Sequence, residues 1–322
     1  MTIKKKTETI EVILMTYGSP KNLKAVPQYL KNVYGGKDAS GDVIKEFQRR
    51  YHLIGGSPLV QITKAQAAAL EKELNKQSKQ TGSDTTFRVA AGMRFSDPFI
   101  KDVVSKIAKD ARMLVGIIMS PQYSPIIMKG YKQELQAAAK DVKGQKLKLK
   151  IAEDWHMQSY FIEALAEKVT EALDKFPAKI RNTVPVLFSA HSMPKRVIDK
   201  EPNYIDDLKQ TAAAVAKKVG LAKDQWMFCY QSAGHTPEEW LKPDFADIMP
   251  ELQKKGQTHV LIAPVQFLAD HLEILYDVGI GARLQAEEHG INFARTESLN
   301  TSSLFIKALA AVVNEQIKNA EL

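Results

Sequence analysis

A histidine and a glutamate follow two of the apolar segments of this chain. His191 ends the segment 184–190 (VPVLFSA), and Glu273 lies a few residues beyond 259–265 (HVLIAPV), where a helix is predicted to begin. Ligands bind at the carboxyl ends of strands in open α/β sheets, so these side chains could face one substrate. An imidazole there can accept a proton or bind a metal ion, and a carboxylate can share either task. The pair predicts proton or metal-ion chemistry.

Acidic residues recur around Glu273 at helical spacing. On a helix, Asp270, Glu273 and Asp277 would share one face, and the next position in that row is Gly281, which ends it. Such a row is typical of a solvated surface, but its start beside a strand exit favours a site that handles a cation. A second face, made of leucines, is predicted to be buried: Leu268, Leu272 and Leu275.

Several common catalytic signatures are missing from the sequence. It has no P-loop, no HExxH, no CxxC and no Gly-x-Ser-x-Gly elbow. The segment 279–284 (GIGARL) resembles half of a dinucleotide fingerprint, but it follows a helix pattern, so we interpret it as a helix end and a turn. Phosphoryl transfer, hydride transfer and serine hydrolysis are therefore disfavoured.

The elements that position these residues form two similar sets. Eight strand patterns alternate with helical patterns, which predicts an α/β protein with parallel sheets flanked by helices. The strands are expected at 11–17, 86–92, 113–119 and 147–152, then at 184–190, 226–231, 259–265 and 291–295, and helices at 64–75, 99–109, 158–175 and 205–219.

The spacing of the strands indicates a duplicated four-stranded unit. The first two strands start about 75 residues apart in one half and about 42 in the other, whereas the later spacings agree more closely. We expect the extra residues within 20–60, covering a cleft between the halves. The strand exits also match, since Tyr17–Pro20 parallels His191–Pro194 and Ser120–Tyr123 parallels Ala263–Gln266. Exits that face one cleft predict a small-molecule site.

The composition favours a cytoplasmic protein that does not bind nucleic acid. The net charge is +8, but the basic residues are scattered, and Lys143–Lys150 alternates with apolar residues like a solvated strand edge. The charged N-terminus, Met1–Glu8, lacks the apolar stretch of a signal peptide, and no apolar run is long enough for a transmembrane helix. The single cysteine, Cys229, excludes an internal disulfide and predicts a buried strand thiol.

One further segment is unusually apolar for a strand exit. Tyr123–Tyr131 (YSPIIMKGY) fits core packing, a flat apolar ligand or a membrane-facing lip equally well. A peripheral contact with a membrane is therefore left open.

At these residues the sequence resembles ferrochelatase, the lyase family that inserts ferrous iron into a porphyrin. The similarity covers nearly the whole chain. The segments that carry it are Leu14–Pro20, Arg50–Leu59, Ser120–Ser124, Ser189–Pro194 and Phe267–Glu273.

The resemblance implies a fold of two Rossmann-like domains around a porphyrin cleft, the chelatase-like fold. The first domain would comprise residues 1–157, with the covering insert at 20–60, and a C-terminal helix at 302–322, seen in the pattern Leu304–Ile317. The second domain, 158–301, would carry His191 and Glu273.

The resemblance also implies roles for individual residues. His191 would accept a proton from the distorted porphyrin or hold the incoming metal, Glu273 would share that duty, and Asp277 would relay protons or iron. Tyr17 would face the metal from the other side. Hydrogen bonds to porphyrin carboxylates would come from Ser57, Ser124 and Tyr131, and apolar contacts with the porphyrin from Ile126 and Met128.

The sequence leaves the substrate open between protoporphyrin IX and coproporphyrin III. Tyr17 and the compact chain favour coproporphyrin, whereas the apolar segment at Ile126 and the replacement of paired family arginines by Lys31–Gly35 favour protoporphyrin. No cofactor is expected beyond the substrate Fe²⁺, no iron–sulfur cluster is expected, and the chain is expected to be a monomer. A chelatase for another metal such as cobalt, and a non-catalytic porphyrin or haem carrier, are the alternatives.

Overall fold

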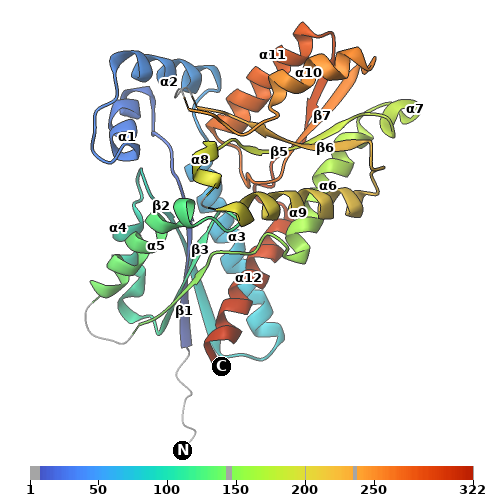
Figure 1. Cartoon of the computed structure of the whole chain (residues 1–322). Helices are drawn as coiled ribbons and strands as arrows, with labels where there is room; N and C mark the ends of the chain where they lie inside the picture. The colour runs from blue at the N-terminus through green and yellow to red at the C-terminus, as the bar shows by residue number, and fades with distance from the viewer. Residues whose placement is uncertain (1–7, 143–146, 200, 235–237, 322) are drawn as a thin grey trace, which may run out of the picture.

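The computed structural model describes residues 8–142, 147–199, 201–234 and 238–321, which fold into two α/β halves (Figure 1). The N-terminal segment 1–7 and part of the Lys-rich segment 143–150 lie outside the described residues. The strands are β1 (Glu8–Thr16), β2 (Thr85–Met93), β3 (Met113–Ile118), β4 (Lys148–Ala152), β5 (Val186–His191), β6 (Trp226–Gln231), β7 (His259–Pro264) and β8 (Asn292–Arg295).

Helices connect the strands in both halves. In the first half they are η1 (Leu23–Ala25), α1 (Val26–Val33), α2 (Gly41–Leu53), α3 (Leu59–Gln80), α4 (Ile100–Ile107), η2 (Ala108–Asp110) and α5 (Pro125–Lys140). The second half and the C-terminus contribute α6 (Ser159–Asp174), α7 (Ala178–Arg181), α8 (Lys195–Ile198), α9 (Pro202–Val219), α10 (Phe245–Lys254), the π-helix η3 (Glu273–Ala282), α11 (Arg283–Glu288) and α12 (Ser303–Glu321).

The two sheets have the same topology. The strand order is β2-β1-β3-β4 in the first and β6-β5-β7-β8 in the second, and every pairing is parallel. The eight strand patterns and the fold class predicted from the sequence are therefore confirmed. Because β1 and β5 occupy equivalent inner positions, Tyr17 and His191 stand at equivalent exits of the two sheets.

The first sheet is buried on both faces. Val12 and Leu14 of β1 pack toward α3 and α12, whereas Ile13 and Met15 pack toward α4 and α5. Continuous apolar runs are typical of parallel strands with helices on both faces, because side chains alternate between two buried surfaces.

A continuous core joins the halves. In the second sheet, Val186 and Phe188 of β5 pack in the same hydrophobic cluster as residues of α3, α6, α9 and α12, while Leu187 faces the cluster formed by α10, η3 and α11. The C-terminal helix α12 packs against α3, β4 and also α6. The domain boundary at 157/158 thus remains a prediction, since helices of both halves share one core.

The insert between β1 and α3 consists of η1, α1 and α2, which Figure 1 shows extending from the first half toward the second. Its own small core contains Tyr29, Leu30 and Tyr51, and Leu272 from the segment just before η3 packs against it. The insert therefore contacts both halves. Among the described residues, no helix has the length and apolar character needed to span a membrane.

Candidate active site

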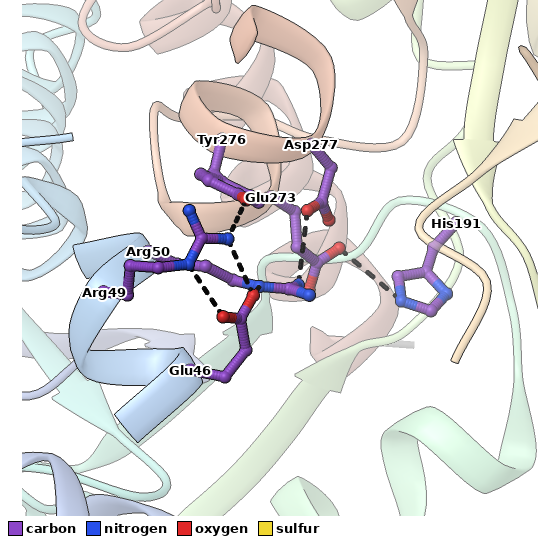
Figure 2. Close-up of polar contacts among 7 residues, drawn as sticks. All are labelled: Glu46, Arg49, Arg50, His191, Glu273, Tyr276 and Asp277. Atoms are coloured by element: carbon purple, nitrogen blue, oxygen red, sulfur yellow. Dashed lines mark hydrogen bonds and ion pairs between the residues drawn. The ribbon is translucent and has the colours of Figure 1, made fainter. Parts of the chain in front are cut away.

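His191 and Glu273 come from neighbouring strands of the second sheet and face each other (Figure 2). His191 is the last residue of β5, and Glu273 opens η3, which follows the adjacent strand β7. The Nε2 atom of His191 lies 3.7 Å from the Oε2 atom of Glu273, and 32% and 34% of the two side chains remain accessible. The structure thus brings the two residues together within reach of a ligand.

Two contacts fix the orientation of His191. Its backbone N–H donates to Oε1 of Gln266 over 2.9 Å, and its Nδ1 atom lies at hydrogen-bond distance from the carbonyl oxygen of Ser192. Because a carbonyl only accepts, Nδ1 carries the proton and Nε2 of the neutral ring has a lone pair. That lone pair faces Oε2 of Glu273, which is buried without a hydrogen-bond partner. A proton or a cation between Nε2 and Oε2 would satisfy both atoms.

Asp277 lies four residues further along η3 and contacts the insert (Figure 2). Its Oδ1 atom is 3.6 Å from Nη1 of Arg50, whose Nε donates to Oε1 of Glu46 over 2.8 Å and whose guanidinium lies 5.0 Å from the ring centre of Tyr276. Burial raises the pKa of Asp277 and repulsion from Glu273 adds to the rise, whereas Ser232 and the charges of Arg50 and His191 oppose it. Arg50 therefore offsets part of the rise in the pKa of Asp277.

The predicted acidic row does not include Asp270. This residue lies in the loop before η3, where its carboxylate accepts hydrogen bonds from Oγ of Ser298 over 2.8 Å and Nδ2 of Asn300 over 3.0 Å. Arg295 stands 3.6 Å away. The prediction that Asp270 shares a helix face with Glu273 was wrong, because the helix begins after Asp270. Its carboxylate stabilises the loop instead.

The buried face of this helix was also predicted incorrectly. Ile274, Val278 and Ala282 form it, whereas Leu272 and Leu275 are half-buried; Leu268 is buried as predicted, but in the preceding loop. The segment 279–284, interpreted as a helix end, continues as η3 and then α11. The prediction failed because the helix begins at Leu272–Glu273, so its buried face starts at Ile274 and repeats every four residues from there.

A cleft of about 330 Å³ opens beside Glu273, a volume in the usual range for small-molecule sites. It is formed by the carboxyl ends of β1 and β3, the insert, the start of α3 and α5, and the loop after β7. Of the residues predicted to act, Tyr17, Ser57, Tyr131 and Glu273 line it. Apolar and aromatic side chains make up most of the rest of the lining: Tyr29, Leu30, Val33, Tyr34, Phe47, Tyr51, Leu59, Ile118, Met119, Ile127, Phe267, Leu268 and Leu272.

Tyr17 projects into this cleft directly after β1. Its ring packs on that of Phe95 with 4.5 Å between centres. Desolvation by the walls of the cleft raises the pKa of Tyr17 to about 12, and the charge of Glu273 adds to the effect. The side chain is consequently a neutral phenol at physiological pH, able to donate a hydrogen bond.

Gly18 fixes the direction in which the chain leaves β1. Its φ is +91°, and a Cβ placed there would lie 2.4 Å from Oγ of Ser96. The carbonyl oxygen of Gly18 accepts a hydrogen bond from the hydroxyl of Tyr29 over 3.1 Å. Only glycine fits this turn without strain, so the position of Tyr17 depends on it.

Three residues predicted to contact a porphyrin do not line the cleft. Ser124 is fully buried and caps α5, because its Oγ donates to Oε2 of Glu201 over 2.5 Å and accepts from the backbone N–H of Ile127. Met128 is buried in the core, and Ile126 is exposed outside the cleft lining. The apolar strand exit Tyr123–Tyr131 enters α5 at Pro125, and Ile127 of that helix lines the cleft instead.

The positively charged side chain of Arg94 lies beside Tyr131. The guanidinium of Arg94 is 5.4 Å from the ring centre of Tyr131 and pairs with Glu134 over 3.1 Å. Gly130 permits this approach, since a Cβ at that position would overlap the guanidinium. Tyr131 is buried, which raises the pKa of its hydroxyl and keeps it protonated.

Apart from Ser57, the cleft residues of the insert were not predicted from the sequence. Phe47 and Tyr51 of α2 line the cleft, and Arg50 on the same helix reaches Asp277. A usable signal was present: Phe47 and Tyr51 are four residues apart, as are Glu46 and Arg50, which is the spacing of neighbours on a helix surface. Gln266, which holds the backbone of His191, carried no comparable signal.

Comparisons with known proteins give a consistent result over the length of the chain. The family model described as Ferrochelatase matches residues 9–317. A "Ferrochelatase" of Deinococcus radiodurans is 34% identical, with 98% of both chains covered. A "Ferrochelatase" of Herpetosiphon aurantiacus is 36% identical over 95% of this chain and 98% of the relative. A "Coproporphyrin III ferrochelatase" of Geobacillus kaustophilus is 35% identical over 95% of each chain.

Solved structures with little sequence identity share the fold. SirB from Bacillus subtilis with Fe³⁺ has a TM-score of 0.60 at 11% identity, covering 98% of this chain and 97% of that one. CbiX, described as the terminal enzyme for biosynthesis of sirohaem in denitrifying bacteria, has a TM-score of 0.54 at 12% identity, covering 96% and 99%. With the family model and the sequence relatives covering nearly the whole chain, this protein belongs to the ferrochelatase family.

Proposed function

We propose that this protein is a ferrochelatase that inserts Fe²⁺ into a porphyrin in haem biosynthesis and releases the two pyrrole N–H protons. The observation that carries the proposal is the pair formed by His191 and Glu273, 3.7 Å apart, of which Glu273 lines a largely apolar cleft, in a chain of the ferrochelatase family. Metal insertion needs a proton acceptor and a metal ligand at one place, and this pair offers both.

The orientation of His191 supports a role as the base. With Nδ1 held by the carbonyl of Ser192, only Nε2 is free to accept a proton from a pyrrole nitrogen. The carboxylate of Glu273 would stabilise the imidazolium that results. An imidazole and a carboxylate also suit Fe²⁺ as ligands, and they bind it less tightly than thiolates bind soft metals, so the ion can pass to the ring.

Asp277 and Tyr17 extend this chemistry in two directions. Asp277 stands behind Glu273 on η3, where it would take protons or iron onward, and Arg50 offsets part of the rise in its pKa. Tyr17 lines the cleft as a neutral phenol, so it would face the metal from the opposite side of the ring as a hydrogen-bond donor. The porphyrin, bent as metal entry requires, would lie between Tyr17 on one side and His191 and Glu273 on the other.

Two further residues would hold the porphyrin carboxylates. Ser57 lines the cleft just before α3, whose N-terminal backbone N–H groups and dipole attract anions. Tyr131 lines the same cleft as a protonated hydroxyl beside Arg94. We propose these two as carboxylate ligands. Ser124 is not included, since its hydroxyl is engaged with Glu201.

We also propose that the chain acts as a monomer without an iron–sulfur cluster. Iron–sulfur clusters are generally held by several cysteine thiolates, and this chain has one cysteine, Cys229, which is buried against the carbonyl of Phe188. The scattered positive charge gives no indication of nucleic-acid binding. The partners would then be the porphyrin and ferrous iron.

Anaerobic Fe²⁺ insertion, followed by absorbance with protoporphyrin IX and coproporphyrin III in parallel, tests the proposal. Turnover of either porphyrin is the expected result, and a large preference for one identifies the substrate. No turnover of either, despite tight porphyrin binding, would contradict the proposal and favour a chelatase for another metal or a carrier. Co²⁺ insertion in the same assay distinguishes those two.

A further inference from the structure

A second group of metal-ligating side chains lies where the two halves meet. Asp154 and His156 belong to the connection between β4 of the first sheet and α6, whereas Asp207 is on α9, which covers the second sheet. One potential ligand atom from each residue lies within 4.8 Å of the others. None of the three lines the cleft beside Glu273.

His156 is the most informative member of this group. Its exposed fraction is 8%, and its Nδ1 atom is 2.6 Å from Oδ1 of Asp154. Since an ionised carboxylate only accepts, Nδ1 carries a proton and the other ring nitrogen, Nε2, has a lone pair in the neutral ring. Nε2 is buried without a hydrogen-bond partner.

The unpartnered nitrogen of His156 faces a carboxylate. Oδ1 of Asp207 is 3.7 Å from Nε2, which is too long for a hydrogen bond. A buried lone pair that faces a carboxylate oxygen is unfavourable unless a cation, either a proton or a metal ion, lies between them. A metal ion with bonds of about 2.0–2.2 Å to nitrogen and oxygen would fit across such a span.

The surrounding charges do not supply that cation. Within the described part of the chain, neither Asp154 nor Asp207 forms a salt bridge with a lysine or an arginine; the nearby Lys132 pairs with Glu153 instead, over 2.8 Å.

We propose that His156 and Asp207 bind a divalent transition-metal ion of the Zn²⁺, Mn²⁺ or Fe²⁺ class at this junction. His156 ligates through Nε2 and Asp207 through a carboxylate oxygen, while Asp154 orients the ring through Nδ1, the arrangement in which a carboxylate supports a metal-bound histidine. Water completes the coordination. The ion joins the β4–α6 connection to α9, so it strengthens the contact between the halves and is separate from the substrate iron.

Equilibrium dialysis with Zn²⁺ tests this site in a variant that lacks the other candidate ligands. In the His191→Gln/Glu273→Gln double variant, about one equivalent of Zn²⁺ should still bind, and adding His156→Gln should abolish it. Adding Asp154→Asn, which removes only the orienting carboxylate, should weaken binding by about 10–100-fold. Adding His289→Gln, at an exposed histidine next to Gln253, should leave binding unchanged.

Thermal unfolding of the same variants provides a second readout. Zn²⁺ should raise the melting temperature of the double variant and of its His289→Gln derivative, but not that of the His156→Gln derivative, since an ion that binds the folded state stabilises it. If the double variant binds no Zn²⁺, or if His156→Gln and Asp154→Asn bind it as the double variant does, the site does not exist. Should His156→Gln fail to fold, the loss of affinity in Asp154→Asn decides between these outcomes.

Discussion

The guanidinium of Arg50 lies 3.6 Å from the carboxylate of Asp277, which joins the insert helix α2 to the π-helix that carries Glu273 (Figure 2). Arg50 is held in place by Glu46 one turn earlier on α2 and by the ring of Tyr276. The insert therefore does more than cover the cleft. Through Arg50 it places a positive charge beside Asp277, which would relay protons or iron.

Replacing Arg50 by glutamine should move the acidic limb of the pH profile for iron insertion to higher pH. Arg50 opposes the rise in the pKa of Asp277, so its loss raises that pKa further and Asp277 ionises later as pH increases. The measurement is kcat/KM against pH. Arg49→Gln is the matched control, because Arg49 is the neighbouring residue of α2 and also contacts Glu46 and Tyr276. An acidic limb that stays in place or moves to lower pH in Arg50→Gln would contradict this account.

Replacing Asp277 by asparagine should stabilise the fold at neutral pH while reducing iron insertion. The pKa of Asp277 is raised in the folded state, so its ionised form is disfavoured there, and the stability it contributes when protonated is lost as pH rises through that pKa. Asparagine avoids this loss, and a gain of about 0.5–2 kcal/mol, seen as a few degrees in melting temperature, is expected. The gain should shrink as pH falls through the raised pKa. A variant less stable than the wild type at pH 7 would refute the prediction.

Gly18→Ala should disturb the cleft more than a glycine substitution with the same backbone angle elsewhere. Gly18 and Gly36 have φ values of +91° and +92°, but a Cβ meets Ser96 at the first position and nothing within 4 Å at the second. Each alanine variant should lose about 1–3 kcal/mol of stability, because alanine is strained at a positive φ. Only Gly18→Ala should also weaken porphyrin binding, measured by fluorescence titration, because it displaces Tyr17. Equal porphyrin affinities in the two variants would mean that the turn at Gly18 does not position Tyr17.

The strands could be predicted because each one is marked by the apolar pattern of its own residues. The buried run Val12–Met15 is apolar at every position, since both faces of a parallel strand are covered. The inner strands β3, β5 and β7 are buried in the same way, whereas the edge strands β4 and β8 are only partly buried. Strand exits place side chains reliably at one edge of a sheet. This is why His191 and Glu273 could be paired from sequence before any contact was visible.

The remaining parts of the site depend on contacts that sequence spacing does not reveal. Ser124 resembles an exposed strand-exit hydroxyl, but Glu201 from the other half engages it. Arg50 reaches Asp277 only because the insert crosses from one half to the other. In the sequence, Gly279 suggests the end of a helix. In the structure it lies within the π-helix, where a Cβ at this position would come within 3.3 Å of the carbonyl oxygen of Ile274.

The central claim is that His191 and Glu273 act together in metal insertion. The most direct measurement is the initial rate of anaerobic Fe²⁺ insertion in His191→Ala and Glu273→Gln, with porphyrin affinity measured on the same preparations and His289→Ala as control. Both variants should bind porphyrin as the wild type does and insert iron about 10²–10⁴-fold more slowly, the contribution expected of a positioned acid–base group. Insertion at the wild-type rate in both variants would show that the chemistry takes place elsewhere.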